Sequence, residues 1–127
     1  MGMTNVLSGI VEGRDGPQAH VRVGTVGLVV ADAAARHGEP VTLCLRPEAL
    51  RILAPGEAPF PGEGLFAGTV KNSEFIGALT RLDVELPDGT PLKVAALDHP
   101  YSRAIPGSTI VLAYDPGRLS IFRSGAT

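Results

Sequence analysis

The segment Val41-Thr-Leu-Cys-Leu-Arg-Pro-Glu-Ala-Leu-Arg-Ile-Leu53 has the pattern of a strand, a proline corner and a second short strand. Val41, Leu43 and Leu45 alternate with polar or small residues, which is the two-residue period of a strand with one buried face. Pro47 then ends that strand, because proline suits the first position of a short helical turn, where its fixed φ and missing N–H cost nothing.

The same pattern returns 69 positions later as Ile110-Val-Leu-Ala-Tyr-Asp-Pro-Gly-Arg-Leu-Ser-Ile-Phe122. The two copies align in register at Val41 and Ile110, at Pro47 and Pro116, and at Ile52 and Ile121. Upstream, Leu7-Ser-Gly-Ile-Val-Glu resembles Phe66-Ala-Gly-Thr-Val-Lys at an offset of 59. An internal duplication explains these matches, and two β modules with similar turn chemistry are the alternative.

The composition is typical of a soluble globular protein, and the length suits one compact domain or two very small ones. The chain has 127 residues, 44% of them hydrophobic and 19% charged, with a formal net charge of -2. This balance argues against a general nucleic-acid surface or an anionic-membrane surface, since both favour an excess of basic residues. No apolar run approaches the length of a membrane span, so we expect no membrane insertion. The single cysteine, Cys44, cannot form an internal disulfide.

Glycine and proline residues that interrupt regular structure suggest the domain limits. Residues 1–4 are interpreted as a cloning remnant or a disordered start, and residues 124–127 as a tail. The stretch from Ala54 to Gly64 has three prolines and three glycines in eleven residues, too many for regular strand pairing, and is interpreted as a linker loop. It separates a first unit at 5–53 from a second at 65–123. No signal peptide is recognised, which suggests cytoplasmic residence.

Each unit is expected to hold about five short strands and no long helix. A strand at 65–74 is expected to bend or bulge at residues 75–78, Asp88-Gly89 forms a hairpin turn, and residues 32–37 and 98–106 connect strands. Five short strands that close on themselves form a small barrel of the OB kind. The predicted fold is therefore all-β, with two OB-like barrels, and the pattern leaves open whether the barrels exchange a strand.

Catalytic and cofactor motifs are not recognised in the sequence. There is no glycine-rich phosphate loop before a helix, and His20, His37 and His99 have no partner at a metal-ligand spacing. Nucleic acid is also disfavoured, because the aromatic residues sit at strand positions expected to be wholly or partly buried rather than available for base stacking: Phe66, Phe75, Tyr114 and Phe122. We expect no catalytic residues, no metal site and no enzyme activity.

The segment with Arg46, Pro47 and Glu48 resembles the carboxy-terminal regulatory domain, called the TOBE domain, in ATP-binding subunits of ABC importers. Further matching features are Asn5 before a glycine-containing strand, the Glu74-Phe75-Ile-Gly77 motif, the Asp88-Gly89 hairpin and Gly107. The resemblance covers about residues 5–123. Arg46 and Glu48 are interpreted as fixing the corner or its packing, with a regulatory role as the alternative. For Glu74 and Gly77, the bend that glycine allows is the favoured reason.

This resemblance implies a non-catalytic regulatory domain that helps to dimerise the subunit. Its implied partners are a second copy and an ATPase domain in the same polypeptide, with permease subunits contacted indirectly at the inner face of the cell membrane. ATP and Mg²⁺ are expected only on that ATPase domain, so this segment holds no cofactor. The alternative is a molybdate-type oxyanion-binding module, a similar small barrel for which this chain offers just two lysines, Lys71 and Lys93.

Overall fold

The computed structural model describes residues 4–31, 36–97 and 105–123. Most of the connections expected at 32–37 and 98–106 therefore lie outside the described residues, as do Met1 to Met3 and the tail. Within the described ranges, no helix is long and apolar enough to cross a membrane.

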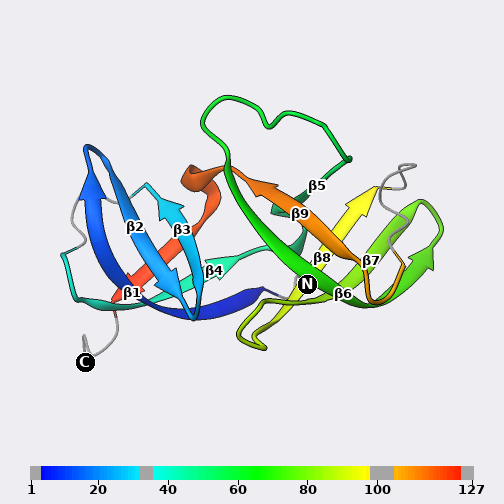
Figure 1. Cartoon of the computed structure of the whole chain (residues 1–127), viewed down its shortest axis with the longest axis horizontal. Helices are drawn as coiled ribbons and strands as arrows, with labels where there is room; N and C mark the ends of the chain where they lie inside the picture. Colours follow the sequence, from blue (N-terminus) through cyan, green and yellow to red (C-terminus); the bar gives the residue numbers. More distant parts are fainter. Residues whose placement is uncertain (1–3, 32–35, 98–104, 124–127) are drawn as a thin grey trace.

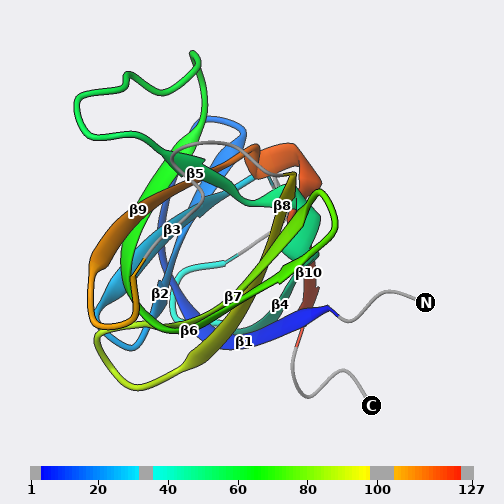
Figure 2. The ribbon, with the colours of Figure 1, turned by 90° about the vertical axis from the view of Figure 1, so that its right-hand side faces the viewer.

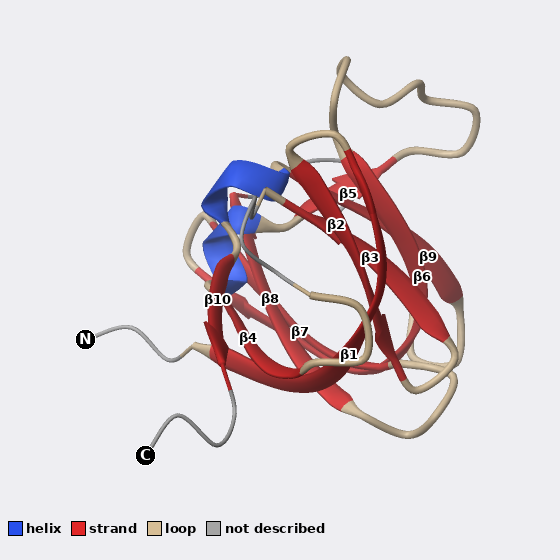
Figure 3. Cartoon of the chain, turned by 90° about the vertical axis from the view of Figure 1, so that its left-hand side faces the viewer, coloured by secondary structure: helices blue, strands red, loops and turns tan. Residues whose placement is uncertain are grey.

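Ten strands form two five-stranded antiparallel sheets (Figure 1). Sheet A has the order β10-β4-β1-β2-β3, and sheet B has the order β5-β9-β6-β7-β8. Within the described ranges, single-turn 3₁₀ helices follow β4 and β9, η1 (Pro47–Ala49) and η3 (Pro116–Arg118), drawn blue in Figure 3. The strands are β1 (Asn5–Asp15), β2 (Gln18–Val23), β3 (Val26–Val30), β4 (Pro40–Leu45), β5 (Arg51–Leu53), β6 (Gly64–Ile76), β7 (Leu79–Glu85), β8 (Pro91–Leu97), β9 (Thr109–Tyr114) and β10 (Ser120–Arg123).

The two sheets exchange their last strands. β5 follows β4 in the chain but pairs with β9, with Ile52 opposite Leu112. β10 follows β9 but pairs with β4, with Ile121 opposite Leu43. Each sheet thus takes its closing strand from the other half of the sequence, which answers the question that the sequence left open.

The internal duplication is confirmed by matching details of the two sheets. Both long strands shift register at the same place, between Val11 and Gly13 in β1 and between Val70 and Asn72 in β6. Gly38 N–H donates to the Val11 carbonyl at 2.7 Å, and the counterpart Gly107 N–H donates to the Val70 carbonyl at 2.7 Å. The proline corners are equivalent too, because each lies between a central strand and an exchanged strand.

Inner faces of both sheets form one continuous hydrophobic core. In β4 the inward residues are Val41, Leu43 and Leu45, and all are buried as the alternation predicts. The Phe66 and Tyr114 rings pack inside sheet B with centroids 5.9 Å apart. The expectation that all four strand aromatics are wholly or partly buried is wrong for Phe75 and Phe122, which are exposed. Phe122 lies on the outward side of β10, opposite Thr42, whereas Phe75 pairs with the buried Thr80 near the end of the β6–β7 hairpin.

The break expected at residues 75–78 is confined to a turn at residues 77 and 78. Phe75 and Ile76 continue β6 and pair with Thr80 and Leu79, so these residues close a tight hairpin instead. Gly77 has φ of 60°, a left-handed conformation that favours glycine, and it forms the turn. The irregularity of β6 lies earlier, at Lys71, where the register shifts.

The proline corners cover the free edges of the opposite sheets. Corner η1 packs on edge strand β8 of sheet B, and corner η3 contacts edge strand β3 of sheet A. Figure 2 shows η1 beside β8, viewed from the side of sheet B. Pro47 and Pro116 are both buried at these contacts. An open sheet edge invites uncontrolled pairing, so the corners protect edges that the strands themselves leave unpaired.

Candidate functional site

Corner η1 forms one wall of a candidate site lined by charged residues. Arg46 is extended and Pro47 opens the 3₁₀ turn, which closes with Leu50 N–H donating to the Pro47 carbonyl at 3.4 Å. No side chain caps this turn. In the equivalent turn of the second copy, Asp115 Oδ1 accepts from Gly117 N–H at 2.9 Å. The two corners therefore differ in how their turns are capped.

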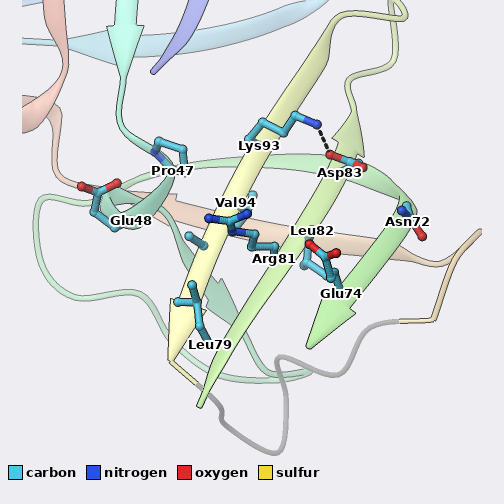
Figure 4. A pocket seen from close by; sticks show the side chains of 11 residues that line it. Pro47, Glu48, Asn72, Glu74, Leu79, Arg81, Leu82, Asp83, Lys93 and Val94 are labelled. Atoms are coloured by element: carbon cyan, nitrogen blue, oxygen red, sulfur yellow. Dashed lines mark hydrogen bonds and ion pairs between the residues drawn. The ribbon is translucent and has the colours of Figure 1, made fainter. Parts of the chain in front are cut away.

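A cleft of about 290 Å³ lies between this corner and the strands β6, β7 and β8 (Figure 4). Pro47 and Glu48 stand on one side, and Asn72 and Glu74 of β6 stand on the other. The structure therefore brings together three residues that the sequence motif pointed to from distant positions: Pro47, Glu48 and Glu74.

Charges of both signs line the cleft. Lys93 of β8 forms an ion pair with Asp83 of β7, which is drawn as a dashed line in Figure 4. Arg81 stands opposite Glu74 in the register of β6 and β7. The cleft is open and mixed in charge, a surface that suits polar contacts with a partner better than acid–base chemistry in a dry site.

Arg46 and Glu48 approach each other across the corner, with Arg46 Nη1 3.8 Å from Glu48 Oε2. Their side chains are 68% and 55% exposed, so water screens this pair. Pro47, which is buried between them, fixes the corner by packing.

The other predicted motif residues lie elsewhere. Asp88 and Gly89 form the β7–β8 turn, where Asp88 accepts hydrogen bonds from Thr90 N and Thr90 Oγ1 at 3.0 and 2.9 Å. These bonds lower the pKa of Asp88. A side chain on Gly24 would collide with Asp88, so this turn packs against the β2–β3 turn of sheet A. Phe75 and Gly77 lie at the far end of the β6–β7 hairpin.

Two cross-sheet contacts were missed by sequence reasoning. Asn5 Nδ2 donates to the Lys93 carbonyl at 2.8 Å, and Lys93 N–H donates to Asn5 Oδ1 at 2.7 Å. Val29 N–H donates to the Tyr114 hydroxyl at 2.7 Å, and that hydroxyl donates to the Val29 carbonyl at 3.0 Å. Burial raises the pKa of Tyr114 to about 12, although the Val29 N–H acts in the opposite direction. The sequence signal for these contacts was a polar group, on Asn5 and on Tyr114, at a strand position that otherwise faces the core.

The linker is held by a single arginine. Arg51 Nη2 donates to Glu63 Oε1 at 2.7 Å and Arg51 Nη1 donates to Glu57 Oε2 at 2.8 Å. The Arg51 guanidinium also lies 4.0 Å from the centroid of the Phe60 ring. Hydrogen bonding to Glu63 raises the pKa of Arg51, and the same contact lowers the pKa of Glu63. Glutamates on both sides of Phe60 were the sequence signal for this cluster.

Comparison with known proteins gives the family. The TOBE domain matches residues 43–122, more than half of the chain. The chain belongs to the TOBE domain family. It is 32% identical over 122 residues to the spermidine/putrescine import ATP-binding protein PotA of Rubrobacter xylanophilus, a match that covers 91% of this chain. It is 31% identical over 90 residues to the protein of the same name from Ruegeria pomeroyi, covering 71% of this chain.

This TOBE domain spans less than a third of those relatives, 30% of the first and 23% of the second. Its fold is similar to that of the cytoplasmic molybdate-binding protein ModG, solved with molybdate bound, with a TM-score of 0.79. That match covers 92% of this chain and 94% of ModG at 14% identity. The likeness confirms the OB-like fold. Among the described residues, no group of three or more histidines, cysteines or carboxylates is placed to hold a metal ion.

Proposed function

We propose that this chain is the non-catalytic regulatory and dimerisation domain of the ATP-binding subunit of an ABC-type importer. The observation that carries the proposal is the similarity to two import ATP-binding proteins over most of this chain but less than a third of their length. A domain that accounts for so small a share of its relatives acts through the remainder of the subunit.

The geometry suits a module that transmits contacts rather than one that performs chemistry. Because β5 and β10 are exchanged, a displacement of one sheet is transmitted to the other through the backbone hydrogen bonds of the exchanged strands. The cleft beside Glu48 and Glu74 offers partners a polar surface close to the corner that covers β8. In this proposal, the polypeptide beyond this domain binds ATP and Mg²⁺, and the subunit works at the cytoplasmic face of the membrane with its permease.

Two measurements test this proposal. The first is sedimentation equilibrium of this chain over a hundredfold range of concentration, where we expect a concentration-dependent dimer. A single monomer mass throughout would contradict a dimerising role. The second compares ATP hydrolysis by the complete subunit with and without this domain. We expect hydrolysis to persist without the domain but to lose its regulation, and no hydrolysis by this chain alone.

A small-oxyanion module is the second candidate, favoured by the likeness to a molybdate-binding fold. The pairing of Lys93 with Asp83 disfavours an oxyanion site in this chain, because that lysine already has an acidic partner. Calorimetric titration of this chain with molybdate, tungstate and sulfate separates the two functions. Binding heat that saturates at one anion per site would favour the oxyanion module, and its absence for all three would favour the regulatory domain.

A further inference from the structure

The hairpin of β6 and β7 in sheet B is longer than the equivalent hairpin of β1 and β2 in sheet A. Beyond the register shift, β1 and β2 form three residue pairs and end with Asp15 opposite Gln18. β6 and β7 form five such pairs and end with Ile76 opposite Leu79. β8 is lengthened as well, because it follows β7 to its first residue, whereas β3 ends opposite the second residue of β2. Sheet A closes without this extension, so the fold itself does not require it in sheet B.

The extended part of β8 contributes to the cleft beside corner η1. Glu74 stands opposite Arg81, and Arg81 stands opposite Ala95 of β8, so these residues form one row across the outer face of the sheet. In the described part of sheet A, β3 ends before the equivalent row. Ala95 is half-buried, and its short side chain leaves the hollow that Glu48 lines from the corner. Glu48 and Glu74 therefore lie on opposite sides of Arg81 (Figure 4).

Two carboxylates and one guanidinium of the cleft remain for a ligand. Lys93 and Asp83 already neutralise each other as an ion pair. Among the residues that the structure describes, neither Glu74 nor Arg81 forms an ion pair. The contact of Glu48 across the corner is long, at 3.8 Å, and exposed to water. The cleft thus offers two negative groups with one positive group between them.

These charges define a class of ligand. A complementary molecule carries two cationic groups and one anionic group. A guanidinium binds a carboxylate through two parallel N–H···O bonds, and carboxylates accept strong hydrogen bonds from ammonium groups. A free basic amino acid such as lysine has this set of groups. The cleft volume of about 290 Å³ lies at the small end of ligand sites, which fits a molecule of that size.

We infer that the cleft beside corner η1 binds a free basic amino acid, with its carboxylate on Arg81 and its cationic groups at Glu48 and Glu74. A ligand that bridges the corner and the strands stabilises the packing of η1 on β8. The inference rests on the proposed function in one respect, that the bound amino acid acts on the subunit through this domain.

NMR titration of this chain with L-lysine at low salt, followed through the backbone amide signals, tests the site. We expect saturable shifts in η1, β7 and β8 with a dissociation constant on the order of 1 mM, because the molecule is small and the cleft is open. Cadaverine lacks the carboxylate and ε-aminocaproate lacks the α-ammonium group. Each should bind at least about tenfold more weakly, since each loses a charge-assisted hydrogen bond. No saturable binding of lysine, or equal binding of cadaverine, would overturn the inference.

A substitution at Arg81 tests the role of the guanidinium. Arg81→Gln gives sheet B the residue of the equivalent Gln18 in sheet A. We expect it to weaken lysine binding at least about tenfold without weakening cadaverine binding, because cadaverine has no carboxylate. Arg22→Gln is the matched control, since it changes the net charge equally and Arg22 pairs with Glu12 on sheet A. An equal loss in both variants would show a response to net charge rather than a site, and would overturn the inference.

A substitution at Ala95 tests the location. Ala95→Leu fills the hollow between Arg81 and corner η1, so we expect the lysine-dependent shifts to disappear. The denaturant midpoint should change little, because the side chain stands on the outer face of β8. Lysine binding of unchanged affinity in this variant would place the ligand elsewhere and would overturn the inference. If the variant does not fold, the comparison of Arg81→Gln with Arg22→Gln decides.

The outcome is separable from the proposed function. If lysine does not bind while deletion of this domain alters ATP hydrolysis by the complete subunit, the ligand site is wrong and the regulatory role stands. If lysine binds but neither lysine nor the deletion changes hydrolysis, the ligand site stands and the regulatory role fails.

Discussion

The two sheets solve one structural problem with different residues. Position Asn5 of β1 corresponds to Gly64 of β6, and their partners across the pair are Leu45 and Tyr114. In sheet A the polar group comes from Asn5, whose amide satisfies the Lys93 backbone of the other sheet. In sheet B it comes from Tyr114, which satisfies the Val29 backbone. A side chain on Gly64 would occupy the space of the Tyr114 ring.

Both sheets therefore require hydrogen-bond partners for the backbone groups of their edge strands. Each outer strand, β3 and β8, offers backbone groups that no neighbouring strand pairs with, and a side chain from the opposite sheet takes them up. A buried backbone group without a partner costs about 1–3 kcal/mol. Either residue type is therefore acceptable if its polar group lies within hydrogen-bond distance of the edge strand's backbone. Duplication kept the geometry of this contact and not the residue that makes it.

Strand exchange predicts that the two sheets unfold together. Leu43 of β4 and Leu112 of β9 are equivalent, and both are fully buried. Replacing either one by alanine is expected to lower the free energy of unfolding by about 2–5 kcal/mol. Denaturant titration of each variant, followed by circular dichroism, is expected to give one transition. Two separate transitions in either variant would mean that the exchanged strands do not couple the sheets.

A difference between the sheets should appear at high pH. The pKa of Tyr114 is raised to about 12 from its ordinary 10.0, so the unfolded chain loses this proton first as pH rises. Stability from this group is complete below pH 10 and is lost as pH rises through the folded value, by about 3 kcal/mol. Denaturant midpoints from pH 9 to pH 12 measure the loss. The Tyr114→Phe variant should lack this component, and parallel curves for the two proteins would contradict it.

The cross-sheet contacts themselves can be compared directly. Asn5→Ala leaves the N–H and carbonyl of Lys93 unpaired, and Tyr114→Phe does the same for Val29. Each variant is expected to lose about 1–3 kcal/mol of unfolding free energy at neutral pH. Chemical denaturation checks both values. Val6→Ala is a suitable control, because Val6 adjoins Asn5 on the exposed side of β1. Losses no larger than that control would show that water replaces these contacts.

A smaller effect is expected where the linker is held. Arg51→Ser gives sheet B the residue found at the equivalent Ser120 of sheet A. The exposed fractions of the Arg51 and Glu63 side chains are 29% and 12%, so we expect a loss of about 1 kcal/mol and faster proteolysis between residues 54 and 64. Ser120→Ala should change neither measurement. The low pKa of Glu63 also implies that this stability, present above pH 4.5, is lost as pH falls further.

Local periodicity and turn chemistry predicted most of this fold. Alternation identified the inward residues of β4, and glycine and proline marked the corners and hairpins, because these signals depend on near neighbours. The exchange of β5 and β10 could not be read in the same way. Both strands have suitable partners in either sheet, and the choice depends on where the corner directs the chain. Phe122 was misplaced for that reason, since its exposure follows from the sheet that β10 joins.

The candidate site was predictable in its residues but not in its grouping. The motif pointed to Glu48 and Glu74 separately, and only the packing of η1 on β8 places them across one cleft. Asn5 was recognised as a family feature, yet its partner, the Lys93 backbone, lies 88 positions away. Every residue other than proline has a backbone N–H and carbonyl, so the residue type at position 93 does not indicate this contact.

The smallest effect is expected at the charges of the first corner, which the second copy replaces with Asp115 and Gly117. Arg46→Ala and Glu48→Ala should each change the unfolding free energy by less than about 0.5 kcal/mol, because the pair is long and exposed. Pro47→Ala is the matched control at the same corner. It is expected to lose about 1 kcal/mol, since proline there is buried and restricts the unfolded chain. Thermal denaturation of the three variants decides between the two readings of the motif. A large loss from either charge would make the motif structural, whereas unchanged stability with altered ATP hydrolysis in the complete subunit would assign Arg46 and Glu48 to a regulatory contact.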